Sequence, residues 1–135
     1  MNRNSDEVRN SALKAFLSYT RAFQKLDPRA VAPYFHEPAF HVTADGARML
    51  PDAPAVEQMY QQVMADLPAR GYVRTDFSGL EAHCLSDNLA QVSGTGEWKT
   101  GANETLMRFG MTYTLRRSAG SWRIVVGLIH DPLPG

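Results

Sequence analysis

Residues 106–130, LMRFGMTYTLRRSAGSWRIVVGLIH, decide the fold of this chain. Two long runs of alternating residues flank the short segment Ser-Ala-Gly, and this pattern predicts a β-hairpin. Counting in twos places five residues of the first run on one face: Met107, Phe109, Met111, Tyr113 and Leu115. The same count in the second run groups Trp122, Ile124, Val126, Leu128 and His130. We therefore expect a hairpin whose apolar face ends in an imidazole.

Three more strands are predicted before the hairpin. Two long ones cover residues 72–85 and 89–99, with turn signals at residues 86–88 and 100–103. Gly94 and Gly96 lie inside the second strand, where glycine often marks a bend. A short strand at residues 39–43 ends at the turn signal Ala44-Asp45-Gly46. The predicted sheet is therefore mainly antiparallel and strongly curved.

Helical patterns occupy the N-terminal half. Apolar residues recur at spacings of three and four over residues 5–25, which predicts an amphipathic helix. Asp27-Pro28 predicts a short second helix that ends near Tyr34, and Asp52 with Pro54 starts a third helix that ends before Pro68.

This order predicts an α+β fold in which three N-terminal helices pack on a strongly curved, mainly antiparallel sheet. Such a sheet closed by helices forms a cone, and the interior of the cone is the natural pocket. The 135 residues suffice for one domain, so we assign residues 1–135 to a single unit.

Charge and composition exclude several classes of partner. Lysine and arginine balance aspartate and glutamate to a net charge of zero, without a basic stripe for a phosphate backbone or an anionic membrane. The sequence has no run near the ~18 apolar residues of a membrane helix. The N-terminus lacks the apolar segment of a secretion signal, so we expect a cytoplasmic protein that binds neither nucleic acid nor membrane.

The front of the chain reads FxxYxxAFQKLDPRAVAPYF over residues 16–35, and the last strand runs from Trp122-Arg123-Ile124 to His130-Asp131-Pro132. With the order of elements, these segments resemble the nuclear transport factor 2-like superfamily. Within it, the chain is similar to the SnoaL-like and ketosteroid-isomerase-like branch, and to bacterial members without an assigned function. The resemblance implies a cone-shaped α+β barrel, and a homodimer formed through the outer face of the sheet.

Comparison with ketosteroid isomerase is informative at four positions. Tyr19 matches the helix tyrosine that belongs to the oxyanion hole of that enzyme. Thr43 stands where the general-base aspartate would be, and Met111 where the protonated aspartate would be. Asp45 lies two residues from the first of these positions and is the remaining acid that could reach back. Because both carboxylates are missing, the resemblance argues against steroid isomerisation.

The same register predicts a pocket lined by aromatic and thioether side chains, typical of sites for small apolar or aromatic molecules. We expect ligand contacts from Tyr60, Thr43, Trp98, Phe109, Met111 and Tyr113. The alternative is that these side chains simply fill the core.

Catalytic candidates in this pocket are His130, His41 and Tyr19. An imidazole titrates near neutral pH and can act as acid or base, while the tyrosine can donate a hydrogen bond. For His130 the alternative is a histidine satisfied by the backbone or by Asp131. The four histidines are scattered and no cysteine pair exists, so we predict no metal site. The sequence Gly94-Thr95-Gly96 lies inside a strand pattern, so we predict no nucleotide cofactor.

Three functional hypotheses remain open. The first is a cofactor-free isomerase, cyclase or dehydratase that moves protons on a small apolar molecule. The second is a non-catalytic binding module, and the third is a dimeric assembly module. An interior filled by methionine and phenylalanine favours assembly, and an open pocket with histidines bonded to backbone favours binding. An open pocket with His130 near a second titratable group favours catalysis.

Overall fold

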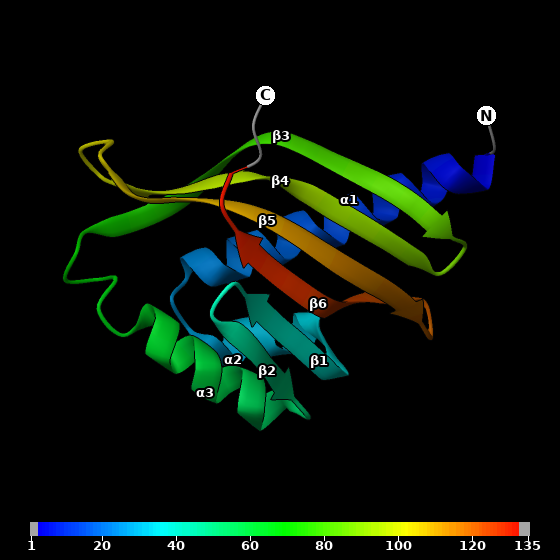
Figure 1. Ribbon diagram of the computed structural model, residues 1–135, viewed down its shortest axis with the longest axis horizontal. Helices are drawn as coiled ribbons and strands as arrows, with labels where there is room; N and C mark the ends of the chain where they lie inside the picture. The colour runs from blue at the N-terminus through cyan, green and yellow to red at the C-terminus, as the bar shows by residue number, and fades with distance from the viewer. Residues whose placement is uncertain (1–2, 133–135) are drawn as a thin grey trace.

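The computed structural model describes residues 3–132, which form three helices and a short hairpin first and a meander of four long strands afterwards (Figure 1). The helices are α1 (Arg3–Gln24), α2 (Pro28–Val31), the 3-10 turn η1 (Ala32–Tyr34) and α3 (Ala53–Met64). The strands are β1 (Phe35–Thr43), β2 (Gly46–Leu50), β3 (Tyr72–Ser86), β4 (Leu89–Thr100), β5 (Thr105–Ser118) and β6 (Ser121–His130). The predicted α+β class is confirmed.

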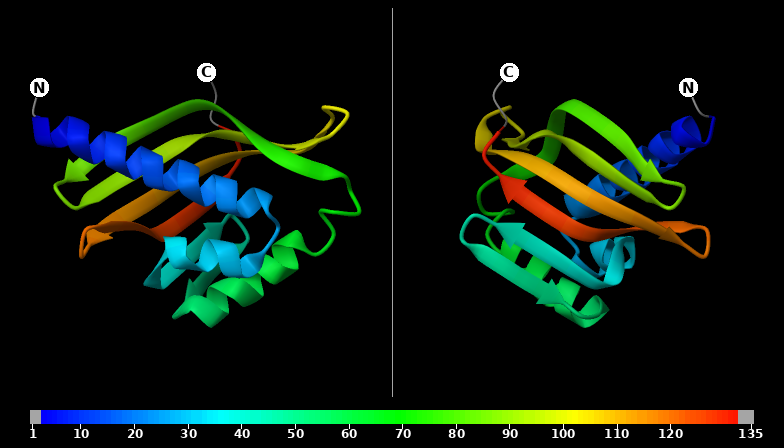
Figure 2. Two further views of the ribbon diagram at one scale, coloured as in Figure 1. Left: turned by 180° about the vertical axis from the view of Figure 1, so that it is seen from behind. Right: turned by 45° about the vertical axis from the view of Figure 1, so that its right-hand side comes forward.

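The strands form one curved sheet in the order β2-β1-β6-β5-β4-β3, in which only β1 and β6 run parallel. The sheet does not close into a barrel, because β2 and β3 remain as its two edges. Helix α1 lies across one face, called the inner face below, and α3 lies beside β1 and β2 (Figure 2). The opposite face, called the outer face, carries no helix of the described residues.

Two aspartates start the shorter helices as predicted. The Asp27 carboxylate accepts the backbone N–H of Arg29, and the Asp52 carboxylate accepts that of Ala55. A short polar side chain at this position satisfies an amide that the first helical turn leaves free, which fixes where the helix begins. The start of α3 in turn sets the positions of Met59 and Tyr60, which are buried against the sheet.

Strand β2 is absent from the prediction. Its sequence, GARML, has no alternating pattern and few residues that favour strands, so nothing local indicates extended backbone. The strand forms because residues 46–50 pair with β1 after the predicted turn, with Thr43 opposite Gly46 and Ala39 opposite Leu50. Strand β1 also begins earlier than predicted, at Phe35 instead of residue 39.

A β-bulge in β6 changes the predicted faces of the last strand. Leu115 pairs with Ile124, but the preceding residue of β5, Thr114, pairs with Val126, so Val125 is an extra residue in β6. An extra residue reverses the alternation of every side chain beyond it, because the side-chain period of a strand is two. The prediction that Val126, Leu128 and His130 share the inner face with Ile124 is therefore wrong.

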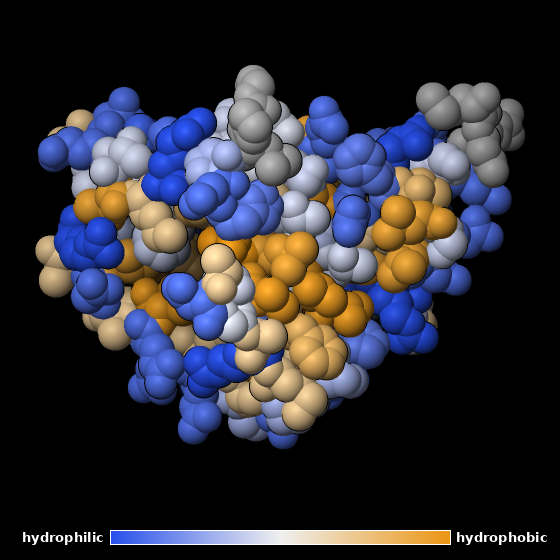
Figure 3. Space-filling view, in the orientation of Figure 1, coloured by the Kyte–Doolittle hydropathy of each residue, from blue (hydrophilic) through white to orange (hydrophobic). Residues whose placement is uncertain are grey.

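The outer face carries an apolar patch as a result. Val126 and Leu128 turn outward and pair with Phe40 and Val42 of β1. Phe40 is 37% exposed, and the other three side chains are half-buried. Figure 3 shows this hydrophobic surface in the middle of the molecule, over β6 and β1. We refer to these four residues as the outer patch.

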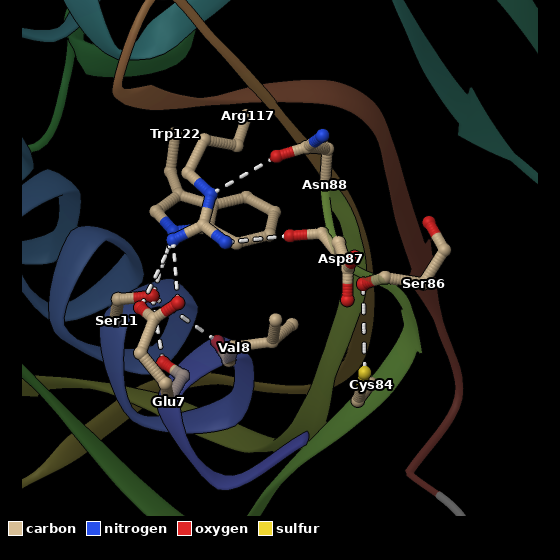
Figure 4. A network of polar contacts seen from close by, with 9 residues as sticks. All are labelled: Glu7, Val8, Ser11, Cys84, Ser86, Asp87, Asn88, Arg117 and Trp122. Carbon is tan, nitrogen blue, oxygen red and sulfur yellow. Dashed lines mark hydrogen bonds and ion pairs between the residues drawn. The ribbon is translucent and has the colours of Figure 1, made fainter. Parts of the chain in front are cut away.

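The N-terminal part of α1 is tied to both hairpins by Arg117. Its guanidinium donates to both carboxylate oxygens of Glu7, each at 2.9 Å, and to the backbone carbonyl of Asp87 at 2.6 Å. It also donates to Asn88 at 3.2 Å and lies 4.8 Å from the ring centroid of Trp122 (Figure 4). One side chain thus joins α1, the β3–β4 turn and the β5–β6 hairpin.

Within residues 3–132, no helix is both long enough and apolar enough to span a membrane.

Candidate functional site

A cavity of about 250 Å³ lies between α1, α3 and the inner face of the sheet. Its wall is mostly aromatic, aliphatic and thioether, with a few hydroxyl groups and one imidazole. The lining residues come from α1, α3 and every strand except β2: Phe16, Tyr19, Thr20, Phe23, His41, Thr43, Met59, Tyr60, Val63, Thr75, Phe77, Trp98, Met107, Phe109, Met111, Tyr113 and Ile129. None of them is Asp, Glu, Lys or Arg.

Three tyrosine hydroxyls meet inside this cavity. The hydroxyl of Tyr19 lies 2.6 Å from that of Tyr60 and 3.4 Å from that of Tyr113. The three side chains come from α1, α3 and β5, so the packing of all three elements creates the cluster. Each side chain is at most 6% exposed. We call this group the tyrosine cluster.

The tyrosine cluster is a set of neutral donors. Burial raises the pKa of Tyr19 and of Tyr60 well above the ordinary value for tyrosine. The neighbouring Tyr113 adds to both shifts, whereas the hydrogen bond with Tyr19 lowers the pKa of Tyr60. Burial also raises the pKa of Tyr113. Because all three groups stay protonated at neutral pH, they can donate a hydrogen bond to an oxygen of a ligand but cannot serve as bases.

Gly127 explains why Tyr113 reaches across the sheet. His41 pairs with Gly127, and Gly127 pairs with Tyr113, so the three residues form a row over β1, β6 and β5 on the inner face. The Tyr113 ring lies over Gly127, with its Cζ atom 3.6 Å from the position a Cβ would take there. The phenol end of Tyr113 therefore points toward the strand that carries His41.

His41 is the imidazole of the cavity. Among residues 3–132 neither of its ring nitrogens has a hydrogen-bond partner within reach, and its side chain is half-buried. Burial lowers the pKa of His41, and the guanidinium of Arg48, its cross-strand partner, lowers it further. The ring is therefore neutral at pH 7 and offers one acceptor and one donor nitrogen.

Thr43 lies next to His41 in the wall, at the end of β1. Its hydroxyl oxygen accepts the backbone N–H of Asp45 at 3.2 Å, which holds the β1–β2 turn. Asp45 itself is exposed in that turn and does not line the cavity, so it does not reach back toward the position of the missing base.

The structure places His130 on the outer face, away from the cavity. The bulge at Val125 turns the ring outward over Gly110, where a Cβ would leave no room for it. Its Nδ1 donates to the backbone carbonyl of Asp131 at 2.7 Å, because a carbonyl only accepts, and Nε2 accepts from the Thr112 hydroxyl at 3.0 Å. The expectation that His130 faces inward is wrong. The structure contains the alternative, a histidine whose two ring nitrogens are both hydrogen-bonded within the protein.

The remaining candidates named from the sequence come together in the cavity wall: Tyr19, His41, Thr43, Tyr60, Trp98, Phe109, Met111 and Tyr113. Further lining residues such as Phe16 and Met59 belong to the apolar stripes of the predicted helices, but their spacing does not distinguish a cavity wall from a filled core. No feature of the sequence indicated that Thr20 or Thr75 would line the cavity. Ile129 replaces His130 because of the bulge, which the alternating pattern conceals.

No cluster for a metal ion exists in the described part of the chain, where three or more His, Cys, Asp or Glu side chains nowhere gather closely enough. Cys84 is half-buried on β3, with its thiol donating to the carbonyl of Ser86 at 3.4 Å. The polar chemistry of the site thus rests on hydroxyl groups and one neutral imidazole.

Comparison with known families agrees with this architecture. Residues 7–132 match the family described as NTF2-like protein (DUF6841). The chain belongs to this NTF2-like family. This membership confirms the resemblance to the nuclear transport factor 2-like superfamily that the element order indicated. No curated protein matches this NTF2-like protein in sequence.

Several solved structures share its fold. An NTF2-like protein of unknown function from Pseudomonas putida has a TM-score of 0.75 at 14% identity, covering 96% of this chain and 90% of that one. The protein Aln2 from a Streptomyces species has a TM-score of 0.75 at 18% identity, with 94% and 92% coverage. An NTF2-like protein with a cystatin-like fold from Novosphingobium aromaticivorans has 0.76 at 15% identity, with 96% and 84% coverage. At these identities the likeness establishes the fold alone.

Proposed function

We propose that this NTF2-like protein binds a small, neutral, largely apolar organic molecule that carries a carbonyl or hydroxyl oxygen. The observation that carries the proposal is the tyrosine cluster, set in a mostly apolar cavity whose wall contains no Asp, Glu, Lys or Arg. The wall gains free energy by covering apolar ligand surface, and the hydroxyls orient the ligand through its oxygen.

Counting protons supports an oxygen acceptor on the ligand. Three O–H donors share two hydroxyl contacts, Tyr19 with Tyr60 and Tyr19 with Tyr113, which leaves one O–H without an acceptor inside the tyrosine cluster. A donor in an apolar cavity gains most from a partner that replaces water there. A ligand carbonyl is such a partner, whereas a carboxylate would lose its hydration without meeting a cation.

The volume of the cavity limits the size of the ligand. A volume of about 250 Å³ lies just below the usual range of about 300–1,000 Å³ for ligand pockets, so one or two fused rings fit and a four-ring steroid does not. This limit agrees with the absence of both carboxylates of the ketosteroid isomerases.

Binding of 1-tetralone, a two-ring ketone, tests the proposal against tetralin, which has the same rings without the oxygen. We expect 1-tetralone to bind about three- to tenfold more tightly, because one hydrogen bond contributes about 0.5–1.5 kcal/mol. Tryptophan fluorescence is a suitable readout, since Trp98 lies in the wall. In Tyr113→Phe the preference for the ketone should shrink.

Tyr34→Phe is the matched control, because Tyr34 is a tyrosine outside the cavity wall. It should leave both affinities unchanged. Binding of neither ring compound would overturn the proposal, as would binding of the anion 2-naphthoate as tightly as 1-tetralone.

Proton transfer is a second candidate function, and the free imidazole of His41 favours it. A neutral histidine can accept a proton from the carbon next to a carbonyl and become an imidazolium, while Tyr113 or Tyr19 donates a hydrogen bond to the oxygen of the enolate that forms. Both groups border a cavity small enough for one ligand to touch them together. The reaction class would be an isomerase, cyclase or dehydratase step without a cofactor.

A homodimer through the outer face completes the proposal. The outer patch of Phe40, Val42, Val126 and Leu128 presents apolar side chains on the face of the sheet that no described helix covers. Threonines of β5 border the outer patch, since Thr112 pairs with Leu128 and Thr114 with Val126. A mixed apolar and hydroxyl surface of this kind suits a two-fold contact between identical copies.

A further inference from the structure

We propose that Arg116 and Arg123 form a receptor for a small oxyanion, a phosphate or a carboxylate, on the outer face where β5 and β6 approach their turn. The two residues lie directly opposite each other in the antiparallel pair β5–β6. Neighbouring Leu115 and Ile124 are buried on the inner face, so both guanidinium groups belong to the outer one. Hydrophilic surface covers this end of the hairpin in Figure 3.

The two charges are not neutralised by the protein. Among residues 3–132 neither Arg116 nor Arg123 forms an ion pair, and Arg123 has no hydrogen-bond partner although its side chain is half-buried. Like charges directly opposite each other destabilise an antiparallel pair. An oxyanion between them would convert this repulsion into two charge-assisted contacts.

Arg117, the residue after Arg116, has a different environment, in which its charge is paired. Its guanidinium meets a carboxylate, an amide oxygen and a backbone carbonyl, as described above. The absence of such acceptors around Arg116 and Arg123 is therefore a local feature of the outer face.

His36 holds Arg116 in place without neutralising it. Nδ1 of His36 donates to the backbone carbonyl of Pro38 at 2.9 Å, so Nε2 is the acceptor for the Arg116 Nη1 donor at 3.0 Å. This contact fixes the guanidinium yet supplies no negative charge. The remaining N–H groups of Arg116 stay available to a ligand oxygen.

A shallow hollow beside Arg123 indicates where the rest of a ligand would lie. It has a volume of about 210 Å³ and is lined by Ala32, Pro33, Phe35, Glu37, Ala53, Val56 and Arg123. The only carboxylate in this lining, Glu37, accepts the backbone N–H of Ala53 through Oε2 at 2.8 Å and keeps its negative charge, so the anionic group of a ligand belongs at the arginines and not in the hollow. The apolar remainder of the hollow suits a carboxylate that carries a small apolar group.

Thermal unfolding with increasing inorganic phosphate, at constant ionic strength set with chloride, tests the proposal. A bound ion stabilises the folded state in proportion to the logarithm of its concentration above the dissociation constant. We expect a saturable rise of the unfolding midpoint, and a dissociation constant weakened about tenfold or more in Arg116→Gln and in Arg123→Gln. Without phosphate both variants should be at least as stable as the natural protein, since the repulsion is removed.

Arg108→Gln is the control, because Arg108 lies on the outer face of the same strand but opposite Glu97. It should respond to phosphate as the natural protein does. Equal responses in all variants would mean a general salt effect and overturn the proposal. Loss of self-association in Arg123→Gln without any phosphate binding would also overturn it, by assigning the arginines to a second copy of the chain.

A second titration compares benzoate with acetate. Tighter binding of benzoate that depends on Arg123 assigns the site to carboxylates with an apolar group in the hollow. Binding of phosphate alone assigns it to free phosphate. Either result supports an oxyanion receptor. Because neither arginine lines the cavity, Tyr113→Phe should leave both results unchanged.

Discussion

At the scale of single residues, His41 and His130 have opposite environments. His130 is bonded through both ring nitrogens and lies over Gly110 on the outer face. His41 has no partner in the described chain and borders an apolar cavity together with three phenols. A functional imidazole needs a free nitrogen within reach of a ligand, and His41 alone of the two has one.

Proton transfer in the cavity should depend on His41 in its neutral form. Exchange of the α-protons of 1-tetralone into heavy water, followed by NMR, measures this. Because the folded pKa of His41 lies below 6.5, the rate should persist through pH 6.5 and fall only at lower pH. His41→Ala should lower the rate about 100-fold or more, the usual share of general base catalysis.

His36→Ala is the control, since His36 lies outside the cavity. An unchanged rate in His41→Ala would show that His41 is not the base and would leave ligand binding as the function. The same pKa shift bears on stability: the unfolded chain binds the proton more readily, so His41 opposes folding progressively as the pH falls below 6.5. Unfolding midpoints measured against pH should fall less steeply in His41→Ala.

At the scale of elements, one extra residue in β6 decides which side chains face the ligand. Beyond Val125, the bulge brings Gly127 and Ile129 inward and sends Val126, Leu128 and His130 outward. Gly127 then gives Tyr113 the room to extend across β6. The cavity and the outer patch are therefore two consequences of the same irregularity.

The contacts of Arg117 hold the N-terminal half of α1 against the two hairpins. Arg117→Ala should lower the free energy of unfolding by about 1–2 kcal/mol, through the lost hydrogen bond to the Asp87 carbonyl and the lost stacking on Trp122. Urea denaturation measures the change. Glu7→Gln should have a much smaller effect, because the Glu7 carboxylate is exposed. Equal effects of the two substitutions would contradict this division.

At the scale of the whole molecule, the two faces of the sheet differ in what they offer. The inner face, covered by α1 and α3, encloses the cavity. The outer face lacks a helix within residues 3–132 and carries the outer patch of Phe40, Val42, Val126 and Leu128. Apolar surface that no element of the chain covers is a common mark of an interface between subunits.

Leu128→Arg and Phe40→Arg test the proposed dimer. Sedimentation or light scattering should show a dimer for the natural protein and a monomer for both variants, because each buries an unpaired charge at the contact. Val73→Arg is the control, since Val73 is 50% exposed on the edge strand β3. A monomeric natural protein, or dimers that persist in both variants, would refute the contact.

Local patterns in the sequence suffice for much of the fold. The helix stripe and the alternation of β3, β4 and β5 reflect side-chain spacing along a single element, so they can be read without knowing any neighbour. Two aspartates likewise mark the beginnings of α2 and α3 because capping is local. The α+β class, the order of the elements apart from β2, and about half of the cavity wall follow from these signals.

Only tertiary structure decided the rest. Strand β2 exists because β1 is there to pair with it, and the bulge at Val125 is a feature of how β6 pairs with β5. Neither feature can be recognised from the sequence of the residues that form it. The sequence by itself therefore determined that a cone with an aromatic interior would form. The packing of distant elements decided that His41 faces that interior, that His130 does not, and that three phenols meet there, since each depends on contacts between residues far apart in the chain.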